Sequence, residues 1–257
     1  MRLTVKVGTS TLTHATGNLN IRLVEDLCKV LSDIKNAGNE IILVTSGAVG
    51  MGVGKLSLKE RPRDLPTKQA AAAVGQCELM YTYDRLFSMY NHTVAQLLLT
   101  AGDISSPDRK KNFINTMDRL LELGAIPIIN ENDTVAVDEL VIGDNDTLSA
   151  IVASEVKADL LVILSDIDGL FTANPKTDPE AVLVSEVREI TPEIVASAGG
   201  SGSELGTGGM ATKLKAAKIV TETGCDMIIT NGKNPEVLYD ILDGKRTGTR
   251  FYGTKEL

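Results

Sequence analysis

The sequence predicts an α/β protein, a three-layer α/β/α sandwich with a mostly parallel central sheet. Two observations predict this class. Short apolar runs alternate along the chain with longer segments of helical periodicity, and some of these runs are apolar at every position. Strands joined by helical crossovers lie parallel, and a sheet that is apolar on both faces needs helices on both. Such sheets bind ligands beyond the carboxyl ends of their strands, so the loops there are the expected functional sites.

The first elements follow from local patterns. Residues 3–8 alternate in polarity and predict a strand, and the run IILV at 41–44 predicts a buried central strand. Between them a helix is predicted over 21–37, with Asn20 as N-cap and Gly38 as the stop. Its apolar residues recur at helical spacing: Leu23, Val24, Leu27, Val30, Leu31 and Ile34.

The alternation continues to the end of the chain. Further helices are predicted at about 67–89, 113–123, 147–156 and 210–223, and further strands at 94–99, 126–129, 160–164 and 227–230. Gly124 and Gly224 follow two of these helices, and Asp146 is the candidate N-cap of the helix at 147. No strong domain boundary is visible, although the sequence changes character after Asp168.

Composition excludes several classes of protein. The chain has 257 residues, 43% of them hydrophobic, and a net charge of −8 from 26 basic and 34 acidic side chains. This is too apolar for a disordered chain and too acidic for a general nucleic-acid surface. No apolar run approaches the ~20 residues that span a bilayer, and the N-terminus lacks a signal-peptide layout. Three scattered cysteines and two histidines leave little material for a zinc site or a Ser-His-Asp triad. We expect a cytoplasmic protein with a small ligand, neither nucleic acid nor membrane.

The loops after the first two strands favour an anion. In Lys6–Ser10 (KVGTS) a cation, backbone N–H groups beside a glycine and two hydroxyls lie together, although an ordinary turn with a surface lysine is the alternative. Residues 45–55 (TSGAVGMGVGK) contain four glycines, but Val49 and Leu56 break the Walker A pattern. We therefore expect another kind of anion-binding loop, with a glycine-rich hinge as the alternative.

Two acidic and amide-rich segments follow. They are 130–134 (NENDT) and 143–146 (GDND), and their carboxylates and amides suit a ligand ammonium, a metal shell or a substrate carboxylate. Helix capping by Asp146 and turn formation by Asp133 are the structural alternatives.

The last two loops are less specific alone. Residues 165–175 (SDIDGLFTANP) predict a tight hairpin. The glycine tract at 199–209 opens the helix that carries Lys213; it only partly matches a dinucleotide fingerprint and suits a phosphate better. Two lysines, glycine loops and no histidine base favour phosphoryl transfer. A carboxylate acceptor is already ionised at neutral pH, so cations that offset repulsion replace a general base.

The motifs KVGTS, VTSGAVGMG, NENDTV, GDND, SDIDGLFTANP and GTGGMATK occur in this order. Together they resemble the amino-acid kinase family, and within it the members that phosphorylate glutamate, over roughly residues 3–250. The resemblance implies the amino-acid kinase fold, ATP and Mg²⁺ as cofactors, and formation of γ-glutamyl phosphate for proline biosynthesis. It implies one domain over 1–257, with the amino acid bound mainly by residues 1–157 and the nucleotide by 158–257, and no C-terminal PUA domain.

The resemblance also assigns residues. Lys6 and Lys213 would clamp the transferring phosphoryl group, Asp146 would orient both, and Gly8 and Gly47 would donate N–H groups to it. The glutamate-binding positions would be Ser46, Asp133, Asn145 and Asn130, with Asp133 facing the ammonium and Asn145 donating to a carboxylate. The nucleotide-binding positions would be Lys6, Ser165, Asp166, Thr207, Gly208, Gly209, Met210, Ala211, Thr212 and Lys213. No side chain is assigned to the metal, because ATP phosphates would hold Mg²⁺.

Some features depart from the family pattern. Ser165 replaces a usual threonine, and Phe171 and Asn174 stand where tyrosine and aspartate are common.

The resemblance further implies feedback inhibition by L-proline and a homo-oligomer, a dimer or tetramer. Two alternatives stay open: an enzyme of the same fold acting on carbamate, aspartate, N-acetylglutamate or a nucleoside monophosphate, and a non-catalytic amino-acid sensor.

Overall fold

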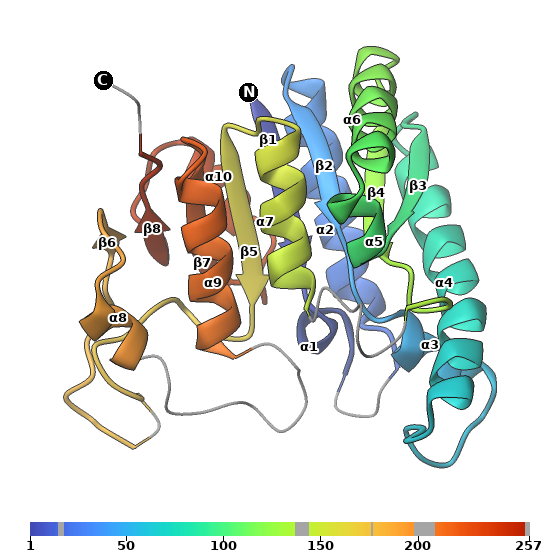
Figure 1. Ribbon diagram of the computed structural model, residues 1–257, viewed down its shortest axis with the longest axis horizontal. Coiled ribbons are helices and arrows are strands. Elements are labelled where there is room, and N and C mark those ends of the chain that lie inside the picture. The colour runs from blue at the N-terminus through green and yellow to red at the C-terminus, as the bar shows by residue number, and fades with distance from the viewer. Residues whose placement is uncertain (15–17, 137–143, 176, 198–208, 255–257) are drawn as a thin grey trace.

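The computed structural model describes residues 1–14, 18–136, 144–175, 177–197 and 209–254. Within these ranges an eight-stranded sheet has the order β3-β4-β2-β1-β5-β7-β8-β6 (Figure 1). Its strands are β1 (Arg2–Val7), β2 (Glu40–Val44), β3 (Val94–Leu99), β4 (Ile126–Glu131), β5 (Leu160–Ser165), β6 (Glu186–Val187), β7 (Asp226–Asn231) and β8 (Thr249–Phe251). Neighbouring strands pair in parallel, except that β8 is antiparallel to β7.

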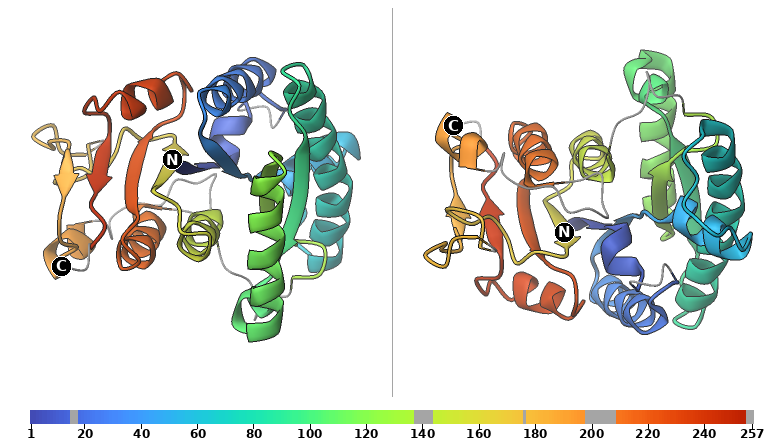
Figure 2. Two further views of the ribbon diagram at one scale, coloured as in Figure 1. Left: turned by 90° about the horizontal axis from the view of Figure 1, so that it is seen from above. Right: turned by 90° about the horizontal axis from the view of Figure 1, so that it is seen from below.

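Helices cover both faces of the sheet (Figure 2). On one face lie α2 (Ile21–Asn36), α4 (Leu65–Ser88) and α10 (Val237–Leu242), and on the other α6 (Pro107–Glu122), α7 (Asn145–Glu155) and α9 (Met210–Thr221). The short helices are α1 (Thr9–Leu12), α3 (Ala48–Lys55), α5 (Ala101–Ser105) and α8 (Pro192–Ser197). This arrangement confirms the predicted three-layer sandwich.

The central strands are apolar at every position because they face two cores. In β2, Ile42 and Val44 pack in the core under α6, α7 and α9, whereas Ile41 and Leu43 pack in the core under α2 and α4. Successive side chains of a strand point to opposite faces, so a fully buried strand needs both sets apolar. The parallel pairing gathers the carboxyl ends of β1, β2, β4 and β5 at one edge of the sheet.

The predicted strands are confirmed to within two residues at each end, and Asn20 caps α2 by accepting a hydrogen bond from Leu23 N at 3.3 Å. The predicted cap Asp146 is wrong. Asp144 caps α7 instead, because its carboxylate accepts from Thr147 N at 2.7 Å. Both aspartates lie at the start of the helix, and only the Asp144 side chain turns back to the exposed N–H groups. The helix predicted at 113 begins earlier, at Pro107.

The glycine segment at 45–55 is not an open loop, since α3 occupies most of it. The reason lies in its packing on α4. A Cβ on Gly52 would lie 1.8 Å from the backbone oxygen of Ala71, and one on Gly75 would lie 1.7 Å from that of Ala48. These glycines let the two helix backbones touch, and this tertiary contact offsets their low helix propensity.

The tight hairpin predicted within 165–175 is also wrong. The antiparallel bridge in this region joins Phe171 to Leu183, so the connection is longer than a tight turn. The segment is held against β8 instead, where Leu170 N donates to the Thr249 hydroxyl at 2.8 Å.

Adding a methyl group at a glycine tests the close backbone contact between α3 and α4. Gly75→Ala should lower the free energy of unfolding by about 2–3 kcal/mol, because its methyl group would overlap a main-chain oxygen. Gly50→Ala in α3 is the matched control: nothing lies within 4 Å of its Cβ, and alanine should slightly stabilise the helix. Urea unfolding of both variants checks this, and equal stability of the two would contradict the close-contact assignment.

Candidate active site

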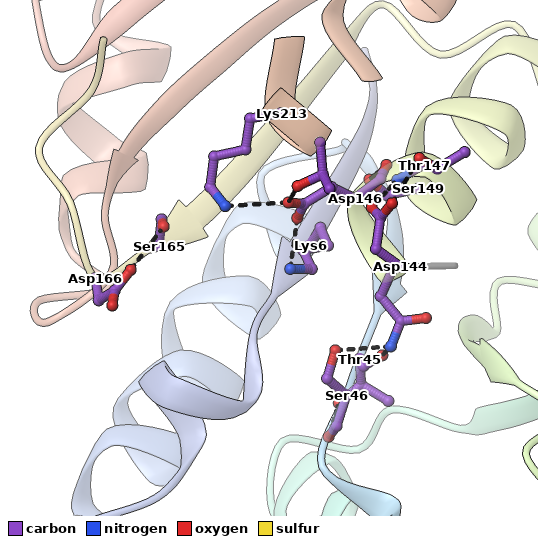
Figure 3. Close-up of polar contacts among 12 residues, drawn as sticks. Lys6, Thr45, Ser46, Asp144, Asp146, Thr147, Ser149, Ser165, Asp166 and Lys213 are labelled. Carbon is purple, nitrogen blue, oxygen red and sulfur yellow. Dashed lines mark hydrogen bonds and ion pairs between the residues drawn. The ribbon is translucent and has the colours of Figure 1, made fainter. Parts of the chain in front are cut away.

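Two lysines from distant parts of the chain meet at one carboxylate beyond the carboxyl edge of the sheet (Figure 3). Lys6 lies in β1, Asp146 in the first turn of α7 and Lys213 in the first turn of α9. Lys6 Nζ lies 2.5 Å from Asp146 Oδ1, and Lys213 Nζ lies 3.0 Å from Asp146 Oδ2. The Thr212 hydroxyl is 3.0 Å from the same Oδ2. The structure thus brings the three predicted catalytic residues together.

This ion cluster is buried. Lys6, Asp146 and Lys213 are 8%, 1% and 4% exposed. Burial raises the pKa of Asp146, but the two adjacent ammonium groups outweigh burial and hold this pKa below its ordinary value. The three side chains together carry a net charge of +1. A buried, preformed cationic cluster of this kind suits an anionic ligand.

The two predicted phosphate-binding glycines lie at the starts of short helices. Gly8 precedes α1, and a Cβ there would lie 3.4 Å from Lys6 Nζ, so its backbone passes close to the ammonium group. Gly47 precedes α3 with φ +99°, a left-handed conformation that side chains rarely adopt. N–H groups in the first turn of a helix have no acceptor within the helix, so both positions favour an anion.

A cluster of polar side chains fills the ends of β2 and β4. Asn145 Nδ2 lies 2.7 Å from Ser46 Oγ, 2.9 Å from the Thr45 carbonyl oxygen and 3.1 Å from Asn130 Oδ1. Asn130 Nδ2 donates in turn to Gln76 Oε1 at 2.9 Å. Among the four predicted glutamate-binding residues, Asn145 therefore contacts both Ser46 and Asn130.

The site also includes Gln76, which is not predictable from the sequence. It stands in the middle of a long alanine-rich helix, where a glutamine is an ordinary exposed residue, and no local pattern distinguishes it. Only the fold shows that it is buried beneath Asn130.

The fourth predicted glutamate-binding residue, Asp133, lies in the turn that follows β4 and is partly buried. Burial raises the pKa of its carboxyl group above the ordinary value. A partly desolvated carboxylate gains most from a cationic partner, so this position suits a ligand ammonium.

The predicted nucleotide-binding residues lie on the other side of Asp146. Figure 3 shows Ser165 and Asp166 at the end of β5, on the Lys213 side, whereas Ser46 lies at the end of β2. Ser165 Oγ donates to Asp166 Oδ1 at 3.2 Å, so the serine keeps a hydroxyl in the place of the usual threonine.

The start of α9 supplies the remaining described positions. Gly209 is its N-cap, and its first turn contains Met210, Ala211, Thr212 and Lys213. Thr207 and Gly208 lie outside the described residues.

The described residues contain no group of three or more histidine, cysteine or acidic side chains placed to hold a metal. They also contain no helix long and apolar enough to cross a membrane. A cavity of about 790 Å³ lies at the opposite edge of the sheet, next to Met1, Leu160 and Asp226. None of the predicted site residues that the structure describes lines it.

The chain resembles known proteins over most or nearly all of its length. The sequence model of the amino acid kinase family matches residues 1–231. The chain is 54% identical to a glutamate 5-kinase of Clostridium perfringens over 258 residues, which cover 99% of this chain and 96% of the relative. It is also 54% identical to a glutamate 5-kinase of Listeria innocua, covering 99% of this chain and 94% of the relative.

Solved structures share the fold at low sequence identity. A carbamate kinase from Giardia lamblia bound to AMP-PNP is 18% identical with a TM-score of 0.72, and the alignment covers 98% of each chain. A UMP kinase from Ureaplasma parvum is 13% identical with a TM-score of 0.67, again covering 98% of each chain. At such identities the likeness establishes the architecture only.

The carboxylate that Lys6 and Lys213 share should make the free energy of unfolding depend on pH. Asp146→Asn should lower the free energy of unfolding at pH 7 by about 3–5 kcal/mol, because it leaves two buried cations without the anion between them. Since the pKa of Asp146 is lower in the folded protein, its stabilisation is present at neutral pH and is lost as the pH falls through the folded value. The stability gap between wild type and variant should therefore be constant above about pH 5 and narrow below about pH 4.

Urea unfolding across this pH range is the measurement. Asp144→Asn is the control, because asparagine also caps helices and Asp144 lies outside the two ion pairs. A gap that stays constant down to pH 2.5 would show that Asp146 does not gain its stability from the lysines.

Proposed function

This chain belongs to the amino acid kinase family, and we propose that it transfers the γ-phosphoryl group of ATP to the γ-carboxylate of L-glutamate. The product is L-glutamyl 5-phosphate, so the reaction is the first step of proline biosynthesis, as the name shared by its relatives in C. perfringens and L. innocua implies. The structural observation that carries the proposal is the meeting of Lys6 and Lys213 at Asp146.

ATP is the phosphoryl donor and Mg²⁺ accompanies it. The net charge of +1 on the buried cluster fits a polyanionic nucleotide. The donor set of the described residues provides no separate three-ligand metal site. By the resemblance, we assign the metal mainly to the ATP phosphates, where it would neutralise charge on the nucleotide.

The residues of this chain then have distinct tasks. Lys6 and Lys213 reduce the repulsion between the phosphoryl group and the incoming carboxylate, and Asp146 positions both ammonium groups. Backbone N–H groups at Gly8 and Gly47 donate to the phosphoryl oxygens. Because the acceptor carboxylate is already ionised at neutral pH, its attack requires positioning and charge neutralisation, with no general base.

The amide cluster revises the expected polarity of Asn145. Both of its N–H groups are occupied by acceptors of the protein, and its buried Oδ1 has no partner among the described residues. The remaining atom is an acceptor, so Asn145 suits the α-ammonium of glutamate rather than a carboxylate. Ser46 Oγ accepts from Asn145, which leaves its own O–H to donate to a substrate carboxylate.

The division of labour along the chain also stays a proposal. Residues 1–157 would mainly bind the amino acid and 158–257 the nucleotide. The positions of Ser46, Asn130 and Asn145 on one side of Asp146, and of Ser165 and α9 on the other, support this division.

Three further expectations rest on the resemblance alone: feedback inhibition by L-proline, assembly into a dimer or tetramer, and a cytoplasmic location. Addition of L-proline to the activity assay tests the first, and sedimentation of the purified protein tests the second.

The activity prediction concerns Lys213. Lys213→Ala should reduce kcat for γ-glutamyl hydroxamate formation by roughly 10²–10³-fold, because it removes one cation from the transition state. Glutamate binding, measured separately by calorimetry, should change little. Lys215→Ala is the matched control, since Lys215 lies in the same helix but is exposed.

Two outcomes would contradict this assignment. Wild-type turnover by Lys213→Ala would remove the lysine from the reaction. Faster ADP release by the unaltered protein with carbamate, aspartate, N-acetylglutamate or a nucleoside monophosphate would assign a different acceptor, and glutamate binding without any turnover would favour a sensor.

A further prediction concerns Asp133. Asp133→Asn should raise KM for glutamate at least about tenfold and leave KM for ATP unchanged, because it removes the charge proposed to face the α-ammonium. Because burial raises the pKa of this carboxyl group, its ionisation opposes folding, so the variant should be slightly more stable than wild type at pH 7. Steady-state kinetics and urea unfolding measure the two effects. An equal rise in both KM values would indicate a folding defect or a misplaced site.

A further inference from the structure

We propose that Gln76 is a positioning residue for glutamate, which acts through Asn130 on Asn145. Gln76 lies in α4, is 6% exposed and contacts Asn130 from beneath the end of β4. This inference rests on the proposed function, because it assumes that glutamate binds at Asn145 and Ser46.

A backbone group fixes the direction of the amide chain. Glu131 N donates to Asn130 Oδ1 at 2.9 Å, and a backbone N–H can only donate. The Asn130 oxygen must therefore face Glu131 N, and the same oxygen accepts from Asn145 Nδ2 at 3.1 Å. Asn130 Nδ2 must then face Gln76, which meets it with an acceptor oxygen at 2.9 Å. A flipped Gln76 amide would place two donors against each other.

The same chain fixes Asn145. Its Nδ2 faces two oxygens whose polarity is settled, the Thr45 carbonyl and Asn130 Oδ1. Its Oδ1 is therefore the atom that remains for a ligand. Gln76 orients Asn130, and Asn130 orients Asn145. Through these two contacts Gln76 helps to present an acceptor, Asn145 Oδ1, to glutamate rather than a donor.

Gln76 carries a cost that a space-filling residue would avoid. Its Nε2 is buried and has no partner among the described residues, and a buried unpaired N–H group is unfavourable. Methionine has a similar length and no such donor. The acceptor oxygen facing Asn130 is the feature of Gln76 that methionine lacks, and this contact is what glutamine supplies at the position.

The position of Gln76 in α4 adds a second link to the site. The preceding residue, Gly75, is the one whose missing side chain lets α4 touch the backbone of Ala48, next to Gly47. One turn of α4 therefore holds both the Asn130 amide and the helix that follows Ser46. Removal of the Gln76 acceptor would release only the first of these, since the glycine contact would remain.

The primary test is Gln76→Met. We expect KM for glutamate to rise about tenfold, because Asn130 loses the acceptor of its Nδ2 and no longer holds Asn145. KM for ATP should be unchanged, because the proposed nucleotide-binding residues lie on α9 and β5. The melting temperature should also be unchanged, because the variant removes the unpaired donor Gln76 Nε2 but leaves Asn130 Nδ2 unpaired. Thr82→Val is the matched control, because it removes a partly buried hydrogen bond to the Glu78 carbonyl oxygen within the same helix and contacts neither Thr45 nor the three amides. Thr82→Val should leave KM for glutamate unchanged.

A double-mutant cycle tests the route of the effect. If Gln76 acts through Asn130, then Gln76→Met added to Asn130→Ala should cause no further rise in KM for glutamate. Additive increases would show that Gln76 acts independently, and a wild-type KM for Gln76→Met would overturn the proposal. Because wild-type turnover of glutamate is measured in the same series, failure of the activity itself is distinguished from failure of this inference.

A measurement on the unaltered protein covers the case in which the methionine variant does not fold. In a protein with ¹⁵N-labelled side-chain amides, glutamate should shift the signals of Gln76, Asn130 and Asn145 together. Asn39, whose amide donates to Ile34 O at 3.0 Å before β2, should not shift and serves as the control. A shift of Asn145 with no response from Gln76 would contradict the proposed coupling.

Discussion

The structure depends on keeping two like charges close together in a buried place. Two ammonium groups without an anion between them would repel each other and would lose their hydration. Asp146 solves both problems, because each of its oxygens faces one lysine, and the favourable pairing outweighs the burial of the carboxylate. The first turn of α7 thereby joins β1 to α9. Stability and the proposed phosphoryl transfer would consequently rest on the same side chain.

The topology makes this meeting possible. In a parallel sheet every strand delivers its carboxyl end to one edge, and β1 lies at the centre between β2 and β5. Ser46 therefore approaches from one neighbouring strand and Ser165 from the other, with the lysine of β1 between them. In the proposed function, an amino acid and a nucleotide would thus reach a common point from opposite sides.

Much of this could be predicted from the sequence, because apolar runs record the burial of strands and the motifs occur in a specific order. The misassigned parts share a physical cause, which is long-range packing. The helix α3 was missed because glycine has a low helix propensity, and only contact with α4 offsets it. In the sequence, Asp144 and Asp146 are equally suitable as helix caps. The two lysines that form ion pairs with Asp146 are distant along the chain, so the sequence does not show that Asp146 is engaged elsewhere. Gln76 carries no local signal, since its importance comes from burial beneath Asn130.

The backbone contact between α3 and α4 has a consequence for how this sequence can vary. When a side chain blocks a substitution, a second change to a smaller neighbour often makes room. At Gly52 and Gly75 the atoms in the way are carbonyl oxygens, which every amino acid possesses. A smaller side chain nearby would not relieve the overlap, so a residue larger than glycine at either position would require the two helix backbones to move apart.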